Sequence, residues 1–94
     1  VAINTVLNVL KPITFILEGY PNAKTVYLTG SFINWEELKY KMTNINGIWT
    51  LTIPIYTGKH HYKFIIDGGW HTDPANPVVE DDGKGNLNSV LFVH

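Results

Sequence analysis

The feature that most constrains the fold of this chain is a hydrophobic pattern with a period of two residues. Across residues 48–53, Trp49, Leu51 and Ile53 alternate with two threonines. Successive side chains of a β-strand point to opposite faces of a sheet, whereas a helix would repeat every 3.6 residues. The pattern therefore predicts a strand with one buried face, and it sets the expectation for the rest of the chain.

Short alternating or β-branched runs recur along the sequence, and turn-forming residues separate them. Asp67-Gly68-Gly69 is the strongest hairpin signal that we identify, because Asp-Gly and Gly-Gly pairs supply the positive φ that tight hairpins need. Pro54 predicts a strand end or an edge. A helical turn is conceivable only over Trp35–Lys41, and the polar segment Glu80–Asn86 is interpreted as a loop. The expected strands are Ile13–Glu18, Thr25–Thr29, Ile48–Ile53, His60–Ile66, Trp70–Thr72 and Asn88–Val93.

Five or six short strands with a turn about every 10 residues predict an all-β fold, an antiparallel β-sandwich. The apolar phase of each strand gives the expected core. These core residues are Leu28, Trp49, Leu51, Tyr62, Phe64, Ile66, Leu91 and Val93.

Length and composition restrict the organisation of the chain and its partners. The 94 residues correspond to one domain, which we place at residues 13–94, with residues 1–12 as a linker or an extra edge strand. The chain begins at Val1 rather than Met, so a fragment or processed product of a larger protein is expected. A net charge of −1 and seven scattered basic residues disfavour nucleic acid and anionic membranes as partners. The absence of cysteine excludes disulfides and thiolate chemistry and leaves the compartment open.

Two tryptophans lie beside turns rather than in the middle of strands. Trp35 ends the segment Gly30–Trp35, and Trp70 follows the predicted hairpin turn. An indole in a loop is hard to bury completely, and its flat face suits the C–H bonds of a pyranose ring. Lys63, Asn86 and Asn88 could supply hydrogen bonds to sugar hydroxyls. The alternative is that both tryptophans close the ends of the sandwich.

The residues with acid, base or metal-binding side chains do not form a recognisable constellation. His60 and His61 are adjacent in a strand and point to opposite faces, so at most one could join His71 in a metal site. Asp67 and Asp73 are explained by turns, and the acidic residues of the segment 80–82 by a solvated run. We therefore expect no catalytic residues, no metal and no cofactor.

The order and spacing of several short motifs resemble carbohydrate-binding module family 48. That family includes the glycogen-binding domain of the AMP-activated protein kinase β subunit and modules that precede glycogen branching and isoamylase-type enzymes. The resemblance covers residues 13–94. The segments that carry it are Val26–Trp35, Gly47–Trp49, Gly58, Tyr62–Trp70, Asp73-Pro74 and Asn88–Leu91.

The resemblance implies an immunoglobulin-like early-set sandwich that binds α-1,4-glucan. Trp35 and Trp70 match two tryptophans that stack on glucose rings, Lys63 matches a lysine that bonds to hydroxyls, and Asn88 matches a loop asparagine. The other two site positions depart from the family pattern. These are Asn86, where the kinase-type modules carry threonine, and Lys84, where they carry an apolar residue that inserts beside the sugar.

The function that this implies is non-catalytic binding of glycogen, starch or malto-oligosaccharides, with a linked or associated catalytic domain as partner. A structural early-set domain that packs on a catalytic or scaffold domain without binding sugar is the second hypothesis. A small glycosidase is the third. Exposure of Trp35 and Trp70 on one face distinguishes the first two hypotheses, because a structural domain would bury them or turn them apart.

Overall fold

The chain folds into nine β-strands and one short 3₁₀ helix, in a computed structural model that describes residues 8–94. Every strand pairing in these residues is antiparallel. No helix in this range is long and apolar enough to cross a membrane. In chain order the elements are β1 (Leu10–Leu17), β2 (Val26–Gly30), η1 (Ser31–Ile33), β3 (Tyr40–Lys41), β4 (Thr43–Ile45), β5 (Ile48–Tyr56), β6 (Gly58–Ile66), β7 (Gly69–His71), β8 (Val79–Asp81) and β9 (Leu87–Val93).

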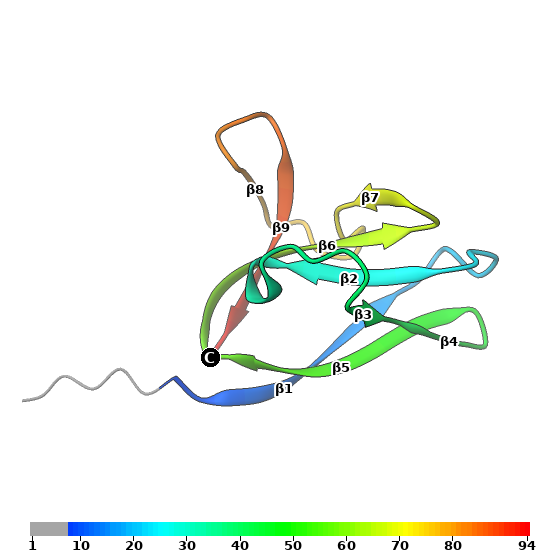
Figure 1. The fold of residues 1–94 in the computed structure, drawn as a ribbon, viewed down its shortest axis with the longest axis horizontal. Helices are drawn as coiled ribbons and strands as arrows, with labels where there is room; N and C mark the ends of the chain where they lie inside the picture. Colours follow the sequence, from blue (N-terminus) through cyan, green and yellow to red (C-terminus); the bar gives the residue numbers. More distant parts are fainter. Residues whose placement is uncertain (1–7) are drawn as a thin grey trace, which may run out of the picture.

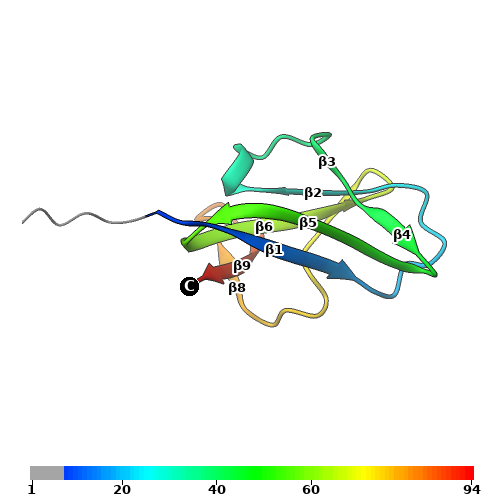
Figure 2. The ribbon, with the colours of Figure 1, turned by 90° about the horizontal axis from the view of Figure 1, so that it is seen from below.

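The strands form two sheets that pack face to face. The first sheet has the order β1-β5-β4, and the second has the order β3-β2-β6-β9-β8, with β7 also paired to β6. In Figure 1 the first sheet lies below the second, and the hairpin of β8 and β9 stands out from the body. Figure 2 shows β1 and β5 running side by side along the molecule, with the second sheet behind them. The predicted immunoglobulin-like antiparallel sandwich is confirmed.

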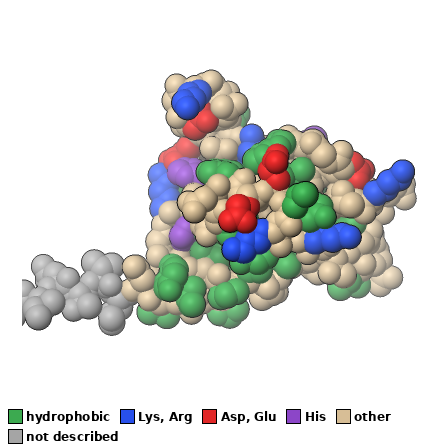
Figure 3. Space-filling model, viewed as in Figure 1, with side chains coloured by type: hydrophobic (Ala, Val, Ile, Leu, Met, Phe, Trp, Pro, Cys, Tyr) green, Lys and Arg blue, Asp and Glu red, His purple; other side chains and the backbone are tan. Residues whose placement is uncertain are grey.

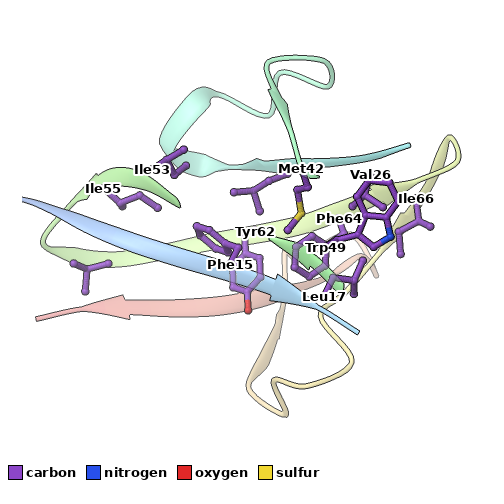
Figure 4. Packing of buried hydrophobic residues seen from close by; sticks show 12 residues of the cluster. Phe15, Leu17, Val26, Met42, Trp49, Ile53, Ile55, Tyr62, Phe64 and Ile66 are labelled. Atoms are coloured by element: carbon purple, nitrogen blue, oxygen red, sulfur yellow. The ribbon is translucent and has the colours of Figure 1, made fainter. Parts of the chain in front are cut away.

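The core lies between the two sheets, and it follows the alternation of the strands. Figure 4 shows Phe15 and Leu17 of β1 pointing toward Tyr62 and Phe64 of β6. Six of the expected core residues are buried, and Leu51 and Leu91 are half-buried against the same cluster. The six are Leu28, Trp49, Tyr62, Phe64, Ile66 and Val93.

Two segments differ from what the sequence pattern predicts. The helical turn expected over Trp35–Lys41 is wrong, because the single helical turn η1 precedes Trp35 and residues 40–41 form β3. Part of the polar segment Glu80–Asn86, interpreted as a loop, is the strand β8, which pairs with β9. In residues 40–41 and in β8, backbone pairing to a neighbouring strand outweighs weak local preferences.

A pair of prolines shows how the first sheet accommodates residues that cannot donate a backbone hydrogen bond. Pro12 of β1 lies opposite Pro54 of β5, inside the strand rather than at its end. The Thr57 N–H donates to the Val9 carbonyl, so residues 9 and 57 form a hydrogen-bonded pair just before this ladder begins. In an antiparallel ladder, hydrogen-bonded and non-hydrogen-bonded pairs alternate, and Pro12–Pro54 is therefore a non-hydrogen-bonded pair. Neither proline therefore removes a hydrogen bond from the ladder.

The expected linker or edge extension over residues 1–12 lies mostly outside the described residues. Its last three residues, 10–12, belong to β1 and pair with residues 54–56 of β5.

Candidate functional site

A tight turn after β2 holds Trp35 beside the second sheet. The Trp35 N–H donates to the Gly30 carbonyl at 3.0 Å, which folds the segment back over η1. Asn34 and Trp35 both adopt positive φ, 52° and 59°. A bulky side chain rarely occupies this region, and such strain of about 1–3 kcal/mol clusters at functional sites.

Gly30 makes this turn possible because the backbone is crowded there. A Cβ atom on Gly30 would lie 2.4 Å from the carbonyl oxygen of His61 and 2.5 Å from the Phe32 ring. A side chain at this position would therefore push η1 and the Trp35 turn away from β6.

The hairpin between β6 and β7 presents Trp70. Ile66 pairs with Gly69, so Asp67 and Gly68 form a two-residue turn with φ of 47° and 85°. The predicted hairpin is thereby confirmed. The Asp67 carboxylate also accepts the backbone N–H groups of Lys24 and Thr25, at 2.8 and 2.9 Å. These bonds tie the tip of the hairpin to the loop before β2.

The two indoles come together on the outer side of the second sheet. Their ring centroids are 6.4 Å apart and their planes are inclined by 38°. Trp35 is half-buried and Trp70 is 41% exposed, whereas Trp49 is 4% exposed and donates its indole N–H to the Tyr20 carbonyl at 2.9 Å. The accessible pair of Trp35 and Trp70 therefore differs in kind from the core residue Trp49.

A cavity of about 410 Å³ lies against the two indoles. We call it the cleft. It combines two aromatic faces with cationic, anionic and amide groups, which can stack on an apolar surface and bond to hydroxyls at its rim. Its lining residues are Trp35, Lys63, Trp70, Asp82, Asn86 and Asn88.

The cleft contains five of the six site residues expected from the sequence and one that was missed. Lys84 does not line it: this residue is exposed in the loop between β8 and β9, where its backbone N–H donates to Asp82. Figure 3 shows this hairpin projecting from the body with charged side chains toward its end. The missed residue is Asp82. An aspartate four residues before Asn86, in a turn rich in glycine, was the available signal.

Hydrogen bonds hold the Asp82 carboxylate. It accepts the Asn86 side-chain amide at 3.1 Å and the backbone N–H groups of Lys84 and Asn86 at 2.8 and 3.3 Å. The Asn86 side chain and the Lys84 backbone N–H lower the pKa of Asp82 below its ordinary value. Asp82 is therefore anionic at neutral pH.

Other acidic side chains have structural contacts outside the cleft. Asp73 accepts the Tyr62 hydroxyl at 2.7 Å, and its own backbone N–H donates to Ser89 at 2.8 Å. Glu80 bridges Lys59 and His61, each at 2.7 Å, and these contacts lower the pKa of Glu80. Within residues 8–94, no three His, Cys, Asp or Glu side chains gather as a group that could hold a metal ion.

Fold and site together define a β-sandwich module with an exposed aromatic cleft. Residues 11–94 match the family model of the glycogen recognition site of AMP-activated protein kinase, so the chain belongs to this family of glycogen- and starch-binding modules. The resemblance to carbohydrate-binding module family 48 is thus confirmed.

Two of the similar proteins come from different kingdoms. The chain is 39% identical over 83 residues to the 5'-AMP-activated protein kinase subunit beta-1 of Sus scrofa, covering 88% of this chain and 64% of that protein. It is 41% identical over 68 residues to protein PTST homolog 2, chloroplastic, of Arabidopsis thaliana, covering 71% of this chain and 13% of that protein. The chain therefore spans only part of these relatives.

The fold also matches a solved structure, the maltogenic amylase from S. marinus. The TM-score is 0.71 at 20% sequence identity, over 88% of this chain and 13% of the amylase. At this identity the similarity concerns the fold alone.

Proposed function

We propose that this chain is a non-catalytic module that binds α-1,4-glucan in the cleft and brings a larger parent protein to glycogen or starch. The observation that carries the proposal is that an exposed indole, Trp70, and a half-buried one, Trp35, surround one cavity together with Lys63, Asn86 and Asn88. The family to which the chain belongs, named for glycogen recognition, supports the same substrate class.

The chemistry of the cleft suits a neutral sugar polymer. Each indole can cover the apolar face of one glucose ring, and the inclination of 38° between the ring planes suits a chain that curves from one residue to the next. Lysine and asparagine side chains supply donors and acceptors to hydroxyls at the ring edges. We expect dissociation constants for short oligosaccharides in the micromolar to millimolar range, which correspond to binding free energies on the order of −4 to −8 kcal/mol. Contacts with accessible rings and solvated hydrogen bonds exceed the entropic and desolvation costs of binding by only a small amount.

The placement of the two indoles on one face, with Trp70 exposed and Trp35 half-buried, also argues against the purely structural alternative. Packing against another domain does not require Trp35 to adopt a strained left-handed conformation with its ring beside the exposed Trp70, whereas a binding site does benefit from such placement. An observation on the opposite side favours a packing role in addition: on β1, Leu10 and Ile16 are exposed. We propose sugar binding on the second sheet and leave the first sheet available for contact with the parent protein.

Calorimetric titration with maltoheptaose tests the proposal. Trp35→Ala and Trp70→Ala are each expected to weaken binding by about 5- to 150-fold, because each removes a desolvated stacking contact of about 1–3 kcal/mol. Neither change should lower the melting temperature by more than a few degrees, since both indoles lie outside the core.

Trp49→Ala is the matched control, because it removes the same side chain from the core and should cost about 3–5 kcal/mol of stability. If the wild type binds maltoheptaose and both cleft variants bind it equally well, the sugar binds elsewhere on the protein. Collapse of both variants on melting would make the two residues structural.

A further inference from the structure

We propose that Asp82 is a further binding residue of the cleft. It accepts a hydrogen bond from a glucan hydroxyl and holds Asn86 beside it, so that the cleft selects neutral glucan with unsubstituted adjacent hydroxyls. This inference rests on the proposed function and adds to it a contact and a selectivity.

The Asp82 carboxylate has acceptor capacity to spare. Its Oδ1 atom accepts two backbone N–H groups, from Lys84 and Asn86, and its Oδ2 atom accepts one N–H from the Asn86 side chain. An ionised carboxylate offers about four acceptor positions, so one remains on Oδ2. Because Asp82 lines the cleft and is exposed, this position is accessible to a ligand.

The same contact fixes the orientation of Asn86. A carboxylate only accepts hydrogen bonds, so the Asn86 side chain must turn its NH₂ group toward Asp82, as the 3.1 Å contact from Nδ2 to Oδ2 shows. The Asn86 carbonyl oxygen is then directed away from the carboxylate, and it remains an acceptor for a ligand. Asp82 thus acts twice, through its own oxygen and as a positioning residue for Asn86.

Lys63 and Asp82 line the same cleft without neutralising each other. The ion pairs within 4.0 Å in residues 8–94 are those of Glu80 with Lys59 and His61. A ligand in the cleft therefore meets a donor from Lys63 and an acceptor from Asp82. Two neighbouring hydroxyls satisfy both, one by accepting from Lys63 and the other by donating to Asp82. A phosphate ester at the donating hydroxyl removes that donor and places a negative charge beside the Asp82 carboxylate, and this repulsion opposes the attraction of Lys63.

The lowered pKa of Asp82 is consistent with this role, because the group stays ionised throughout the neutral and mildly acidic range. Hydrogen bonds to an ionised acceptor are shorter and stronger than those between neutral groups.

Calorimetric titration of Asp82→Asn with two ligands tests the proposal: maltoheptaose, and maltoheptaose carrying one phosphate monoester. The asparagine amide has nearly the shape of the carboxylate but contains one oxygen instead of two. If this oxygen accepts the backbone N–H groups of Lys84 and Asn86, the NH₂ group occupies the position of Oδ2, where it can no longer accept a hydrogen bond from a hydroxyl. Binding of maltoheptaose should weaken by about fivefold or more. The affinity ratio of neutral to phosphorylated ligand should fall by about fivefold, because the repelling charge is gone.

Asp81→Asn is the matched control. The Asp81 carboxylate accepts the N–H groups of Gly83 and Gly85 in the same loop, but it does not line the cleft. This variant should bind both ligands as the wild type does.

The outcomes separate the inference from the function on which it rests. Wild-type affinity for maltoheptaose in Asp82→Asn overturns the inference. Equal weakening for both ligands also overturns it, since a loosened loop would affect them alike. If the wild type and Asp81→Asn bind neither ligand, the proposed function itself fails, and the inference fails with it.

Discussion

Tyr62 anchors the loop that follows β7 from inside the sandwich. Its side chain is buried, its hydroxyl donates to Asp73 at 2.7 Å, and it accepts from the Asn76 amide at 3.1 Å. Asn76 donates in turn to the Val90 carbonyl of β9 at 2.8 Å. One buried phenol therefore connects the loop between β7 and β8 to the strand that carries Asn88.

This environment predicts loss of stability at alkaline pH. Burial, and then the hydrogen bond to Asp73, raises the pKa of Tyr62 well above its ordinary value near 10. Above about pH 10 the unfolded chain gives up this proton and the folded chain keeps it, so stability falls as pH rises, by at most about 1.4 kcal/mol per pH unit. Urea unfolding at about pH 8 and about pH 11 measures the loss.

Tyr62→Phe should be less stable at neutral pH by about 1–2 kcal/mol, because Asp73 loses a partner, but its stability should fall less steeply with pH. Tyr56→Phe, at a residue 52% exposed, is the control and should keep the wild-type slope. An unchanged alkaline slope in Tyr62→Phe would contradict the assignment.

At the scale of residues, sequence reasoning identified most of the cleft but not its geometry. Trp35, Lys63, Trp70, Asn86 and Asn88 were predictable because turns and strand phase determine where side chains can be exposed. Asp82 was missed because a run of acidic residues is usually solvated. Its position in the cleft wall and its contact with Asn86 distinguish it from Asp81, and neither is visible in the sequence. The positive φ of Trp35 and the close approach of the backbone at Gly30 are tertiary features that no local sequence pattern reveals.

At the scale of elements, the packing of η1 against β6 depends on Gly30. Gly30→Ala should cost about 1–3 kcal/mol of stability and weaken maltoheptaose binding, because the added Cβ meets the backbone of His61, which cannot move aside alone. Chemical denaturation and calorimetry measure the two effects.

Gly69→Ala provides the comparison, since Gly69 lacks a positive φ and the tightest contact of its added Cβ would be the end of the His71 side chain, at 3.2 Å. The Ile66 carbonyl oxygen, at 3.5 Å, would be at ordinary van der Waals distance. This variant should lose less stability than Gly30→Ala. Equal losses would mean that the close approach at Gly30 does not determine the position of the Trp35 turn.

Some elements were missed although the sequence contained their signal. Asn46-Gly47 forms a two-residue hairpin turn with φ of 52° and 87°, between β4 and β5. Asn-Gly is a strong hairpin signal, and recognising it would have predicted β4. The sequence of β8 contains a weaker signal, because a strand of three residues is too short to show a pattern of its own and is defined by its pairing with β9.

At the scale of the whole molecule, the two sheets have different outer surfaces. The first sheet exposes apolar side chains, including Leu10, Ile16, Ile45 and Ile48, and Figure 3 shows hydrophobic side chains along the lower edge of the molecule, over β1 and β5. The cleft lies on the second sheet. The sandwich itself was predictable because alternation and turn spacing recur along the chain, whereas the assignment of strands to sheets depends on pairings between distant segments.

Those distant pairings determine when, during folding, the molecule acquires its cleft. β1 must find β5 across four intervening elements, and β6 pairs with β2 before it in the chain and with β9 after it. Closing such loops precedes any gain from contact, so sandwiches of this kind fold in milliseconds to seconds. Two hairpins of consecutive strands contribute to the cleft: β6–β7 bears Trp70, and β8–β9 bears Asp82, Asn86 and Asn88. These two hairpins and the Trp35 turn come together only when β6 pairs with both β2 and β9.

Refolding in a stopped-flow instrument with maltoheptaose present should therefore produce the ligand-dependent fluorescence change at the rate of the slowest folding phase. A ligand signal in an earlier phase would mean that the β6–β7 hairpin binds before β9 docks. If the cleft binds glucan as proposed, binding reports that the fold is complete. A nascent chain that lacks β9, which carries Asn88, has an incomplete cleft, so we expect it to bind glucan only after β9 is in place.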